Sequence, residues 1–258
     1  MELRIKKGDR KMKKTLLFII LGVVTLGCII YGSVKYVGGG IKSLKQYGIN
    51  IETDDFDDDC DIREVFPEKN SSINQVLDSF SSIKIDVSIM DLTVEEGKEF
   101  KVNGFFNRDY LKPSVSVENG VLEVKQLKKK VFGLPAGNNN CRMVITIPSG
   151  TSLSDVNISS NVGDIKIRDL NAKDLDLECN VGEISVRKVN FEELNCNTNV
   201  GEIDIYQNGN LEEYTIKVNT DVGEVTVDGS SYKRSYNSKG STSKRIVAST
   251  NVGEINLR

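Results

Sequence analysis

The sequence of 258 residues contains no histidine and no tryptophan. Without histidine, a Ser-His-Asp triad, a Cys-His dyad and an imidazole-ligated metal site are all excluded. Without tryptophan, the chain lacks the side chain that offers the strongest stacking surface for sugars and bases. These absences remove whole classes of catalytic site, and the sequence predicts no catalytic residue, no metal and no cofactor.

Charge is divided unevenly along the chain. Residues 1–37 carry eight basic and two acidic side chains (+6), so residues 38–258 must sum to −9 to give the overall net charge of −3. An acidic body of this kind argues against a protein that binds nucleic acid.

The N-terminus has the pattern of a membrane anchor. A basic segment, residues 1–14, precedes an uncharged run from Thr15 to Val34. With the residues up to Val37, this run is long enough for a helix to cross the hydrocarbon core, and no signal-peptidase site follows it. A lipidated Cys28 is the alternative, disfavoured because the apolar run continues past it. We therefore expect a protein of the cell membrane. Residues 1–14 would form a cytoplasmic tail, residues 15–37 a transmembrane signal-anchor helix, and residues 38–258 an extracellular part.

Residues 38–80 have the composition of a linker. They open with three glycines, Gly38–Gly40, and contain the acidic run Asp54–Asp61. The run lacks the alternating ligands and the central glycine of an EF-hand, so a calcium loop is not favoured. Repelling charges predict a solvated tether.

A seven-residue phrase recurs five times after residue 150. Each copy reads Asn/Asp-Val-Gly-Asp/Glu and then alternates apolar with polar residues. The glycines of the five copies, spaced by 19, 19, 22 and 30 residues, are Gly163, Gly182, Gly201, Gly223 and Gly253. A repeat of this period is typical of a solenoid, in which each copy forms one coil.

The phase of the repeat predicts which side chains face the core. Residues one, three and five positions before each Asn/Asp share one face, and the Asn-Val-Gly forms a corner, where glycine accepts unusual backbone angles. At roughly 3.3 Å per residue, 19 residues make a circuit of about 60 Å. We expect a right-handed, single-stranded parallel β-helix over residues 81–258, in which successive coils pair in parallel and Met90 stands at the corner of a degenerate first copy. Cys179 and Cys196 fall inside but out of phase, which predicts free buried thiols.

The chain is similar to a known family. The segments 82–87, 119–124 and 144–150 and the Val-Gly-Asp/Glu-Ile corners resemble the "putative adhesin" family of β-strand repeats, a domain of unknown function common in the envelopes of Gram-positive bacteria. The resemblance covers about residues 75–258 and implies a β-solenoid at the cell surface with no established activity. The family often has Asp where most corners here have Glu.

The corner carboxylates form the first candidate site. They would stack about 4.8 Å apart, and they are Asp164, Glu183, Glu202, Glu224 and Glu254. That spacing is close to the carboxylate pair of retaining glycosidases, and it could suit calcium. A ladder that repeats because the fold repeats is the favoured interpretation, with a structural and solubilising role.

A basic insert forms the second candidate site. Residues 228–245 lengthen one coil and contain two tyrosines, Tyr232 and Tyr236, and five cations, Lys233, Arg234, Lys239, Lys244 and Arg245. Inserts in solenoids map to loops on one face, often the binding face. A second basic segment, residues 125–142, shares this character.

Together these features predict a non-enzymatic envelope protein that binds an anionic cell-wall polymer or a protein partner, or serves an envelope-stress system. An enzyme acting on envelope polysaccharide is the alternative, since β-helices host lyases and hydrolases.

Overall fold

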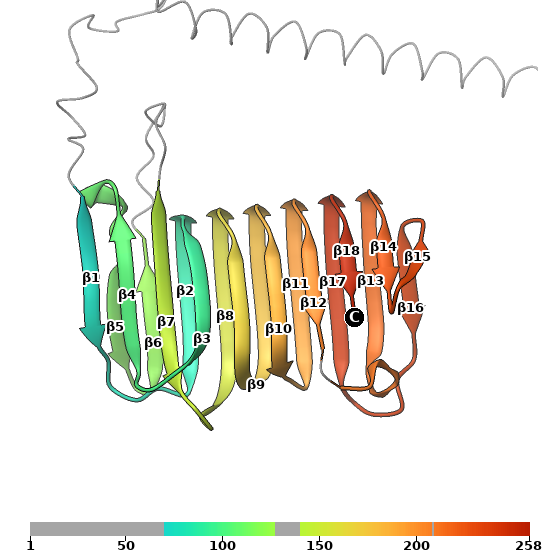
Figure 1. The fold of residues 1–258 in the computed structure, drawn as a ribbon, viewed down its shortest axis with the longest axis horizontal. Coiled ribbons are helices and arrows are strands. Elements are labelled where there is room, and N and C mark those ends of the chain that lie inside the picture. Colours follow the sequence, from blue (N-terminus) through green and yellow to red (C-terminus); the bar gives the residue numbers. More distant parts are fainter. Residues whose placement is uncertain (1–69, 127–139, 208) are drawn as a thin grey trace, which may run out of the picture. The chain divides into compact units, whose positions relative to one another are not determined.

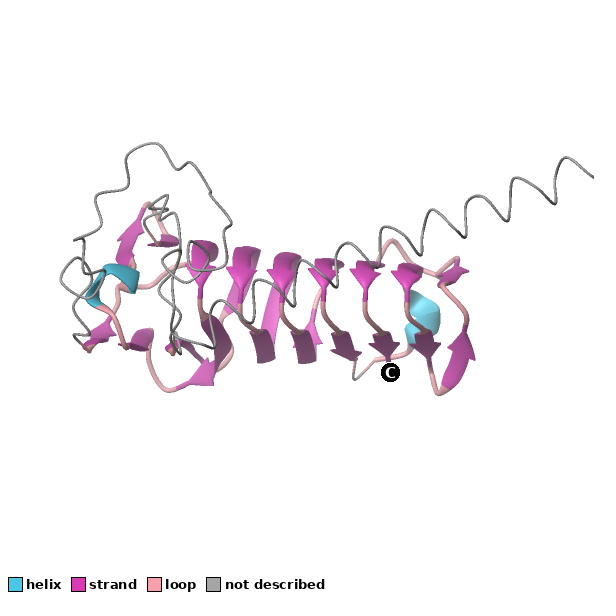
Figure 2. Cartoon of the chain, turned by 90° about the horizontal axis from the view of Figure 1, so that it is seen from above, coloured by secondary structure: helices cyan, strands magenta, loops and turns pink. Residues whose placement is uncertain are grey.

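The computed structural model describes residues 70–126, 140–207 and 209–258. These residues form a stack of β-coils with strands in two rows (Figures 1 and 2), plus two single turns of 3₁₀-helix, η1 (Asp109–Leu111) and η2 (Leu211–Glu213). The predicted membrane anchor and the linker up to residue 69, with its acidic run, lie outside the described residues. Within the described part, no helix has the length and apolarity to cross a membrane.

The first row of strands runs along one side of the stack. In spatial order it contains β5 (Ser114–Glu118), β6 (Val121–Lys125), β2 (Ser82–Ile89), β8 (Ser152–Val162), the second half of β9 (Ile165–Val181), β11 (Glu193–Val200), β17 (Arg245–Val252), β13 (Thr215–Val222) and β16 (Ser235–Ser238).

The second row faces the first across the core. Its order is β1 (Ser71–Val76), β4 (Lys101–Phe106), β7 (Cys141–Pro148), β3 (Asp91–Gly97), the first half of β9, β10 (Ile184–Asn190), β12 (Ile203–Tyr206), β18 (Ile255–Leu257), β14 (Val225–Val227) and β15 (Ser230–Tyr232). Strand β1 lies within the segment expected to be linker, so the folded body begins before residue 81.

The core between the two rows follows the phase of the repeat. All fifteen residues that lie one, three and five positions before the corner Asn or Asp are buried, as predicted, and so are the apolar residues after each glycine. The residues directly before each corner Asn or Asp are small and mostly polar because they support the corner backbone. They are Ser160, Cys179, Thr198, Thr220 and Thr250. Thr220, for example, donates its hydroxyl hydrogen to the carbonyl oxygen of Gly253 at 2.9 Å.

The corners require glycine for two reasons. Gly182 has φ +147°, a conformation that residues with a side chain rarely adopt. A Cβ at this position would lie 2.3 Å from the carbonyl oxygen of Gly163 on the next coil. The glycine N–H groups bond across coils, as from Gly182 to the carbonyl of Val200 at 3.0 Å. Met90 occupies the predicted first corner, where its N–H donates to the carbonyl of Val162 at 2.9 Å.

The order of the coils differs from the prediction at both ends. Neighbouring coils pair in parallel, but β17–β18, the last coil in the chain, lies between β11–β12 and β13–β14. At the other end, β2–β3 lies between β6–β7 and the coil of β8 and β9. The prediction that successive coils are neighbours is therefore wrong at the ends and correct in the middle. Every copy carries the same phrase, so the repeat alone does not select a partner.

Candidate functional site

The insert after β14 is a cap on the C-terminal end of the stack, not the lengthened coil that the sequence predicted. Asp228 and Gly229 have φ values of 48° and 72°, which form the tight turn of a hairpin between β14 and β15. Strand β16 then pairs antiparallel with β13. The ring centroids of Tyr232 and Tyr236 lie 4.7 Å apart, and both side chains pack against the core. The cap thus covers both strands of the outermost coil.

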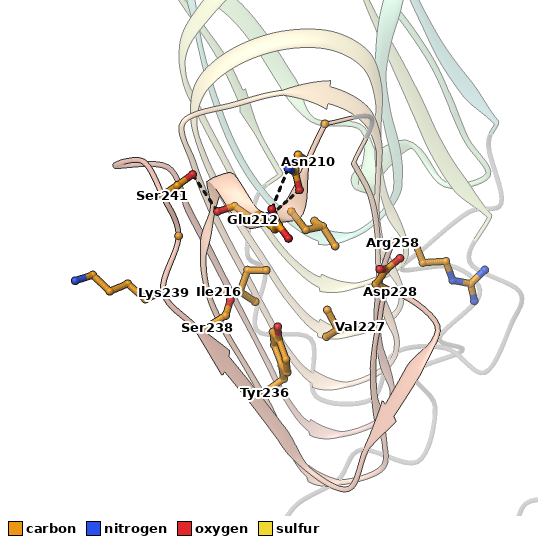
Figure 3. A pocket seen from close by; sticks show the side chains of 13 residues that line it. Asn210, Glu212, Ile216, Val227, Asp228, Tyr236, Ser238, Lys239, Ser241 and Arg258 are labelled. Atoms are coloured by element: carbon orange, nitrogen blue, oxygen red, sulfur yellow. Dashed lines mark hydrogen bonds between the residues drawn. The ribbon is translucent and has the colours of Figure 1, made fainter.

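A cavity of about 750 Å³ lies beside this cap. Figure 3 shows the apolar side chains of Ile216, Val227 and Tyr236 along one wall. The opposite rim is polar and fixed by hydrogen bonds, because Asn210 Oδ1 accepts from the N–H of Glu212 at 2.9 Å. Ligand sites in proteins commonly have volumes of roughly 300–1,000 Å³ with apolar walls and a few fixed polar groups. This cavity therefore has the size of a ligand site, with an open mouth and a lining that is about equally polar and apolar.

Three of the five predicted binding cations are exposed on the cap. Lys233 and Arg234 form the turn between β15 and β16, and Lys239 follows β16 at the rim of the cavity, where its side chain points away from it (Figure 3). Within the described part of the chain, none of the three forms an ion pair. Their charges are therefore available to a ligand, at the two ends of β16.

The other two predicted binding cations are held by acidic partners on neighbouring segments. Lys244 Nζ lies 2.7 Å from Glu213 Oε2 and 5.4 Å from the centroid of the Tyr214 ring, and the hydrogen bond to Glu213 raises the pKa of Lys244. Arg245 lies 3.9 Å from Glu193 across the β17–β11 pairing. The structure therefore divides the five cations into a free group on the cap and a paired group at the start of β17.

The second basic segment is described only at its ends. Lys125, at the end of β6, lies 2.6 Å from Glu123, an ion pair that raises the pKa of the lysine and lowers that of the glutamate. The residues of the segment between 127 and 139 lie outside the described part of the chain.

The corner carboxylates form a continuous row, as predicted, but the last two exchange places. The coils put them in the order Asp164, Glu183, Glu202, Glu254 and Glu224. Desolvation and the nearby charges of Asp204, Glu254 and Glu183 raise the pKa of Glu202. At one end of the row, Asp164 Oδ1 accepts from the N–H of Glu183 at 3.1 Å and Asp164 Oδ2 pairs with Lys166 at 3.1 Å. No cluster of three or more possible metal ligands occurs in the described residues.

The corner valines are a surface feature that the sequence analysis missed. Five of the six large hydrophobic residues that are exposed in the described chain form one row, here called the valine row: Val162, Val181, Val200, Val252 and Val222. Their exposed fractions lie between 44% and 61%. Simple strand alternation places these residues inside, but the chain turns at the corner and directs them outward. The sequence signal for this row was that every copy of the phrase has a valine directly after the corner Asn or Asp.

A family model and solved structures match this architecture. The model described as "Toastrack DUF4097" matches residues 80–233, more than half of the chain. The chain belongs to the Toastrack DUF4097 family. A crystal structure of a "putative cell adhesion protein" from Clostridium sporogenes is similar to this Toastrack chain, with a TM-score of 0.60, 18% identity, and coverage of 73% of this chain and 99% of that one.

A second solved structure is more distant. It is a "putative adhesin" from Bacteroides fragilis, with a TM-score of 0.45, 15% identity, and coverage of 74% of this chain and 98% of that one. No curated protein matches the chain. The comparisons confirm the predicted resemblance to the adhesin-like repeat family and an all-β, solenoid-like fold.

The three described thiols of this Toastrack domain are buried and free, which confirms the prediction for Cys179 and Cys196. Cys179 pairs with Thr198 and Cys196 with Leu177, so the two sulfurs are out of register. Burial raises the pKa of all three thiols, that of Cys141 to about 11. They are protonated near neutral pH, which makes them poor nucleophiles.

Proposed function

We propose that the chain is a membrane-anchored, non-enzymatic protein of the cell envelope, and that the C-terminal end of its solenoid binds an anionic envelope polymer. The observation that carries this proposal is the cap. Lys233, Arg234 and Lys239 are exposed on it and unpaired within the described chain, while the body of the protein is net acidic.

The arrangement suits a repeating polyanion better than a single small anion. The two cations of the turn and the one at the rim are separated by the four residues of β16, about 13 Å of strand. Lys and Arg bind phosphate through charge-assisted hydrogen bonds, and contacts spread along a polymer add up. The neighbouring cavity offers a concave surface for an uncharged part of the same polymer.

Retention on purified Gram-positive cell wall tests this proposal. The fragment 70–258 contains every described strand and omits the basic residues 1–37, which would bind a polyanion by themselves. We expect its retention to fall steeply between low salt and physiological salt, because exposed charges are screened over about 8–10 Å. A triple variant, Lys233→Ser with Arg234→Ser and Lys239→Ser, should lose most of the retention.

The matched control removes the same charge from the opposite end of the stack. Lys84, Lys98 and Lys112 are exposed there, and their change to serine should leave retention intact. Equal retention of both triple variants would overturn the proposal. Release of soluble saccharide by the wild-type fragment would instead support the enzymatic alternative.

A further inference from the structure

The valine row is a straight apolar strip on an otherwise polar corner. Neighbouring coils are about 4.8 Å apart, so its five valines extend over about 19 Å. Ile89, which pairs with Val162, continues the strip at a half-buried position. Single exposed valines are ordinary, whereas an aligned set that contains nearly all the exposed large hydrophobics marks an interaction surface.

The two flanks of the strip differ in chemistry. On the first-row side lie the corner asparagines, which bond to one another along the stack: Asn180 to Asn161 at 2.8 Å, Asn199 to Asn180 at 2.7 Å and Asn251 to Asn199 at 3.1 Å. Each of these three amides uses one N–H in the ladder and has a second one, since an amide nitrogen has two donors. On the second-row side lies the row of carboxylates, which are acceptors only.

We propose that the valine row is the face through which two copies of this chain associate side by side, with their stacks parallel. A two-fold axis parallel to the strip brings each valine against the same valine of the other copy. It also reverses the flanks, so at four of the five coils an asparagine of one copy faces a carboxylate of the other, while at the end coil Asp221 stands in place of the asparagine and faces Glu224. Amide donors then meet acceptors, and the two acidic rows stay on opposite sides of the interface.

The antiparallel arrangement lacks this complementarity. A two-fold axis across the strip places asparagines against asparagines and carboxylates against carboxylates. Like charges that face each other oppose association, and Glu202 is already surrounded by Asp204, Glu254 and Glu183 within one copy. Self-complementarity of amide with carboxylate therefore favours a second copy in the parallel arrangement.

The size of the strip sets the strength of the association. Three rows of side chains about 19 Å long cover much less than the roughly 800 Å² per partner of a stable complex. The pair is therefore transient, and chemical trapping is the suitable assay. The two arrangements also predict different cross-links. Only the parallel one brings Val162 and Val222, at the ends of the strip, against the same residue of the other copy.

Cysteine cross-linking of the full chain in detergent micelles tests the proposal. The background carries Cys28→Ser and Cys60→Ser, and the remaining thiols are buried. Single variants Val162→Cys, Val200→Cys and Val222→Cys are treated with a short bis-maleimide reagent. We expect all three to form covalent dimers several times faster than Val76→Cys, a matched control at an exposed valine of β1. Adding Val181→Lys to Val222→Cys should abolish the dimer.

Each contrary outcome is distinct. Dimers from Val200→Cys alone would indicate the antiparallel pair and overturn the parallel one. Rates equal to that of Val76→Cys at all three positions, or a dimer that Val181→Lys does not weaken, would show that the valine row does not hold two copies together. An unchanged melting temperature of each variant confirms that the fold is intact.

Discussion

The two ends of the solenoid are closed by the same chain route but filled with different side chains. At the C-terminal end the chain passes beyond one coil position, builds a capping hairpin, and returns to fill the position with β17–β18. At the N-terminal end the same route runs in the reverse chain direction: β2–β3 forms first, the capping strands and β6–β7 follow outside it, and the chain then passes over β2–β3 to reach β8. Each hairpin has two left-handed residues in its turn, Asn119-Gly120 between β5 and β6 and Asp228-Gly229 between β14 and β15. At both ends antiparallel strands, not the inserted coil, cover the edges that the parallel coils would leave open.

The N-terminal end is filled by aromatic side chains. Phe106 is fully buried, and the rings of Phe80 and Phe100 lie 4.8 Å apart. The C-terminal end is covered by half-exposed tyrosines and has the cavity beside them. The difference indicates a division of labour, in which one end contributes stability and the other remains accessible.

The Asn-Val-Gly corners lie above one another along the stack, here called the corner column, and its two ends also differ in burial. At the N-terminal end, Gln126 is buried, and its Oε1 accepts from the N–H groups of Ser88 at 2.7 Å and Ile89 at 3.0 Å. At the other end, Val222 and Gly223 are exposed. A side chain thus seals the corner column at one end, and solvent meets it at the other.

The largest predicted effect is the loss of stability when an aromatic side chain is removed from the N-terminal end, compared with the same change at the C-terminal end. Phe106→Ala should lower the free energy of unfolding by about 3–5 kcal/mol, because it leaves a cavity among fully buried groups. Tyr236→Ala should cost only about 1–2 kcal/mol, because its ring is half exposed next to an existing cavity. Urea denaturation of the two variants measures both values. Equal losses would contradict the division of labour between the ends.

An intermediate effect is expected at the sealed corner. Gln126→Leu should lower the free energy of unfolding by about 2–3 kcal/mol, because the backbone N–H groups of Ser88 and Ile89 would lose their acceptor while partly buried. Gln126→Glu keeps the acceptor but loses the N–H that Nε2 donates to the carbonyl oxygen of Leu111, so the two variants separate the roles of acceptor and donor. If the leucine variant were as stable as the wild type in urea, the seal would have no structural role.

The smallest effect is expected in the middle of the corner column. The pKa of Glu202 lies above its usual value of 4.5, so its ionised form opposes folding. This penalty is complete above the raised pKa and disappears as the pH falls below 4.5. Glu202→Gln should therefore raise the free energy of unfolding by less than about 1 kcal/mol at pH 7 and leave it unchanged near pH 3.

Thermal unfolding at the two pH values checks the Glu202 prediction. Glu178→Gln, at an exposed position of β9 away from the corners, is the control for the loss of one carboxylate. Stabilisation by Glu202→Gln at pH 3 as large as at pH 7 would mean that charge repulsion along the carboxylate row is not the cause.

The repeat was sufficient to predict the coils, the corner glycines and the inward residues, because burial has the same period as the sequence. It was not sufficient to predict which coil lies beside which. Val200 pairs with Val252 and not with Val222, although both stand in the same corner phrase, so the phrase does not decide the pairing. Two signals pointed to the ends. One was the pair of Asn-Gly and Asp-Gly turns, typical of hairpins.

The other signal was Asp221, the one copy that replaces the corner asparagine. A carboxylate has no hydrogen to donate along the ladder, which suits only an end of the row. The candidate site was predictable as a basic segment but not as a cap. Its division into free and paired cations depends on Glu213 and Glu193, which belong to other coils.

The position of β17–β18 has a consequence for the order of assembly. When residues 193–227 have been synthesised, β11–β12 and β13–β14 are complete, yet the coil that joins them, residues 245–257, does not exist. The two carry the same corner phrase, so direct contact between them would be a near-native trap. Escape requires that contact to open again before the last strands insert. Completion of this end is therefore a late, non-local step in folding.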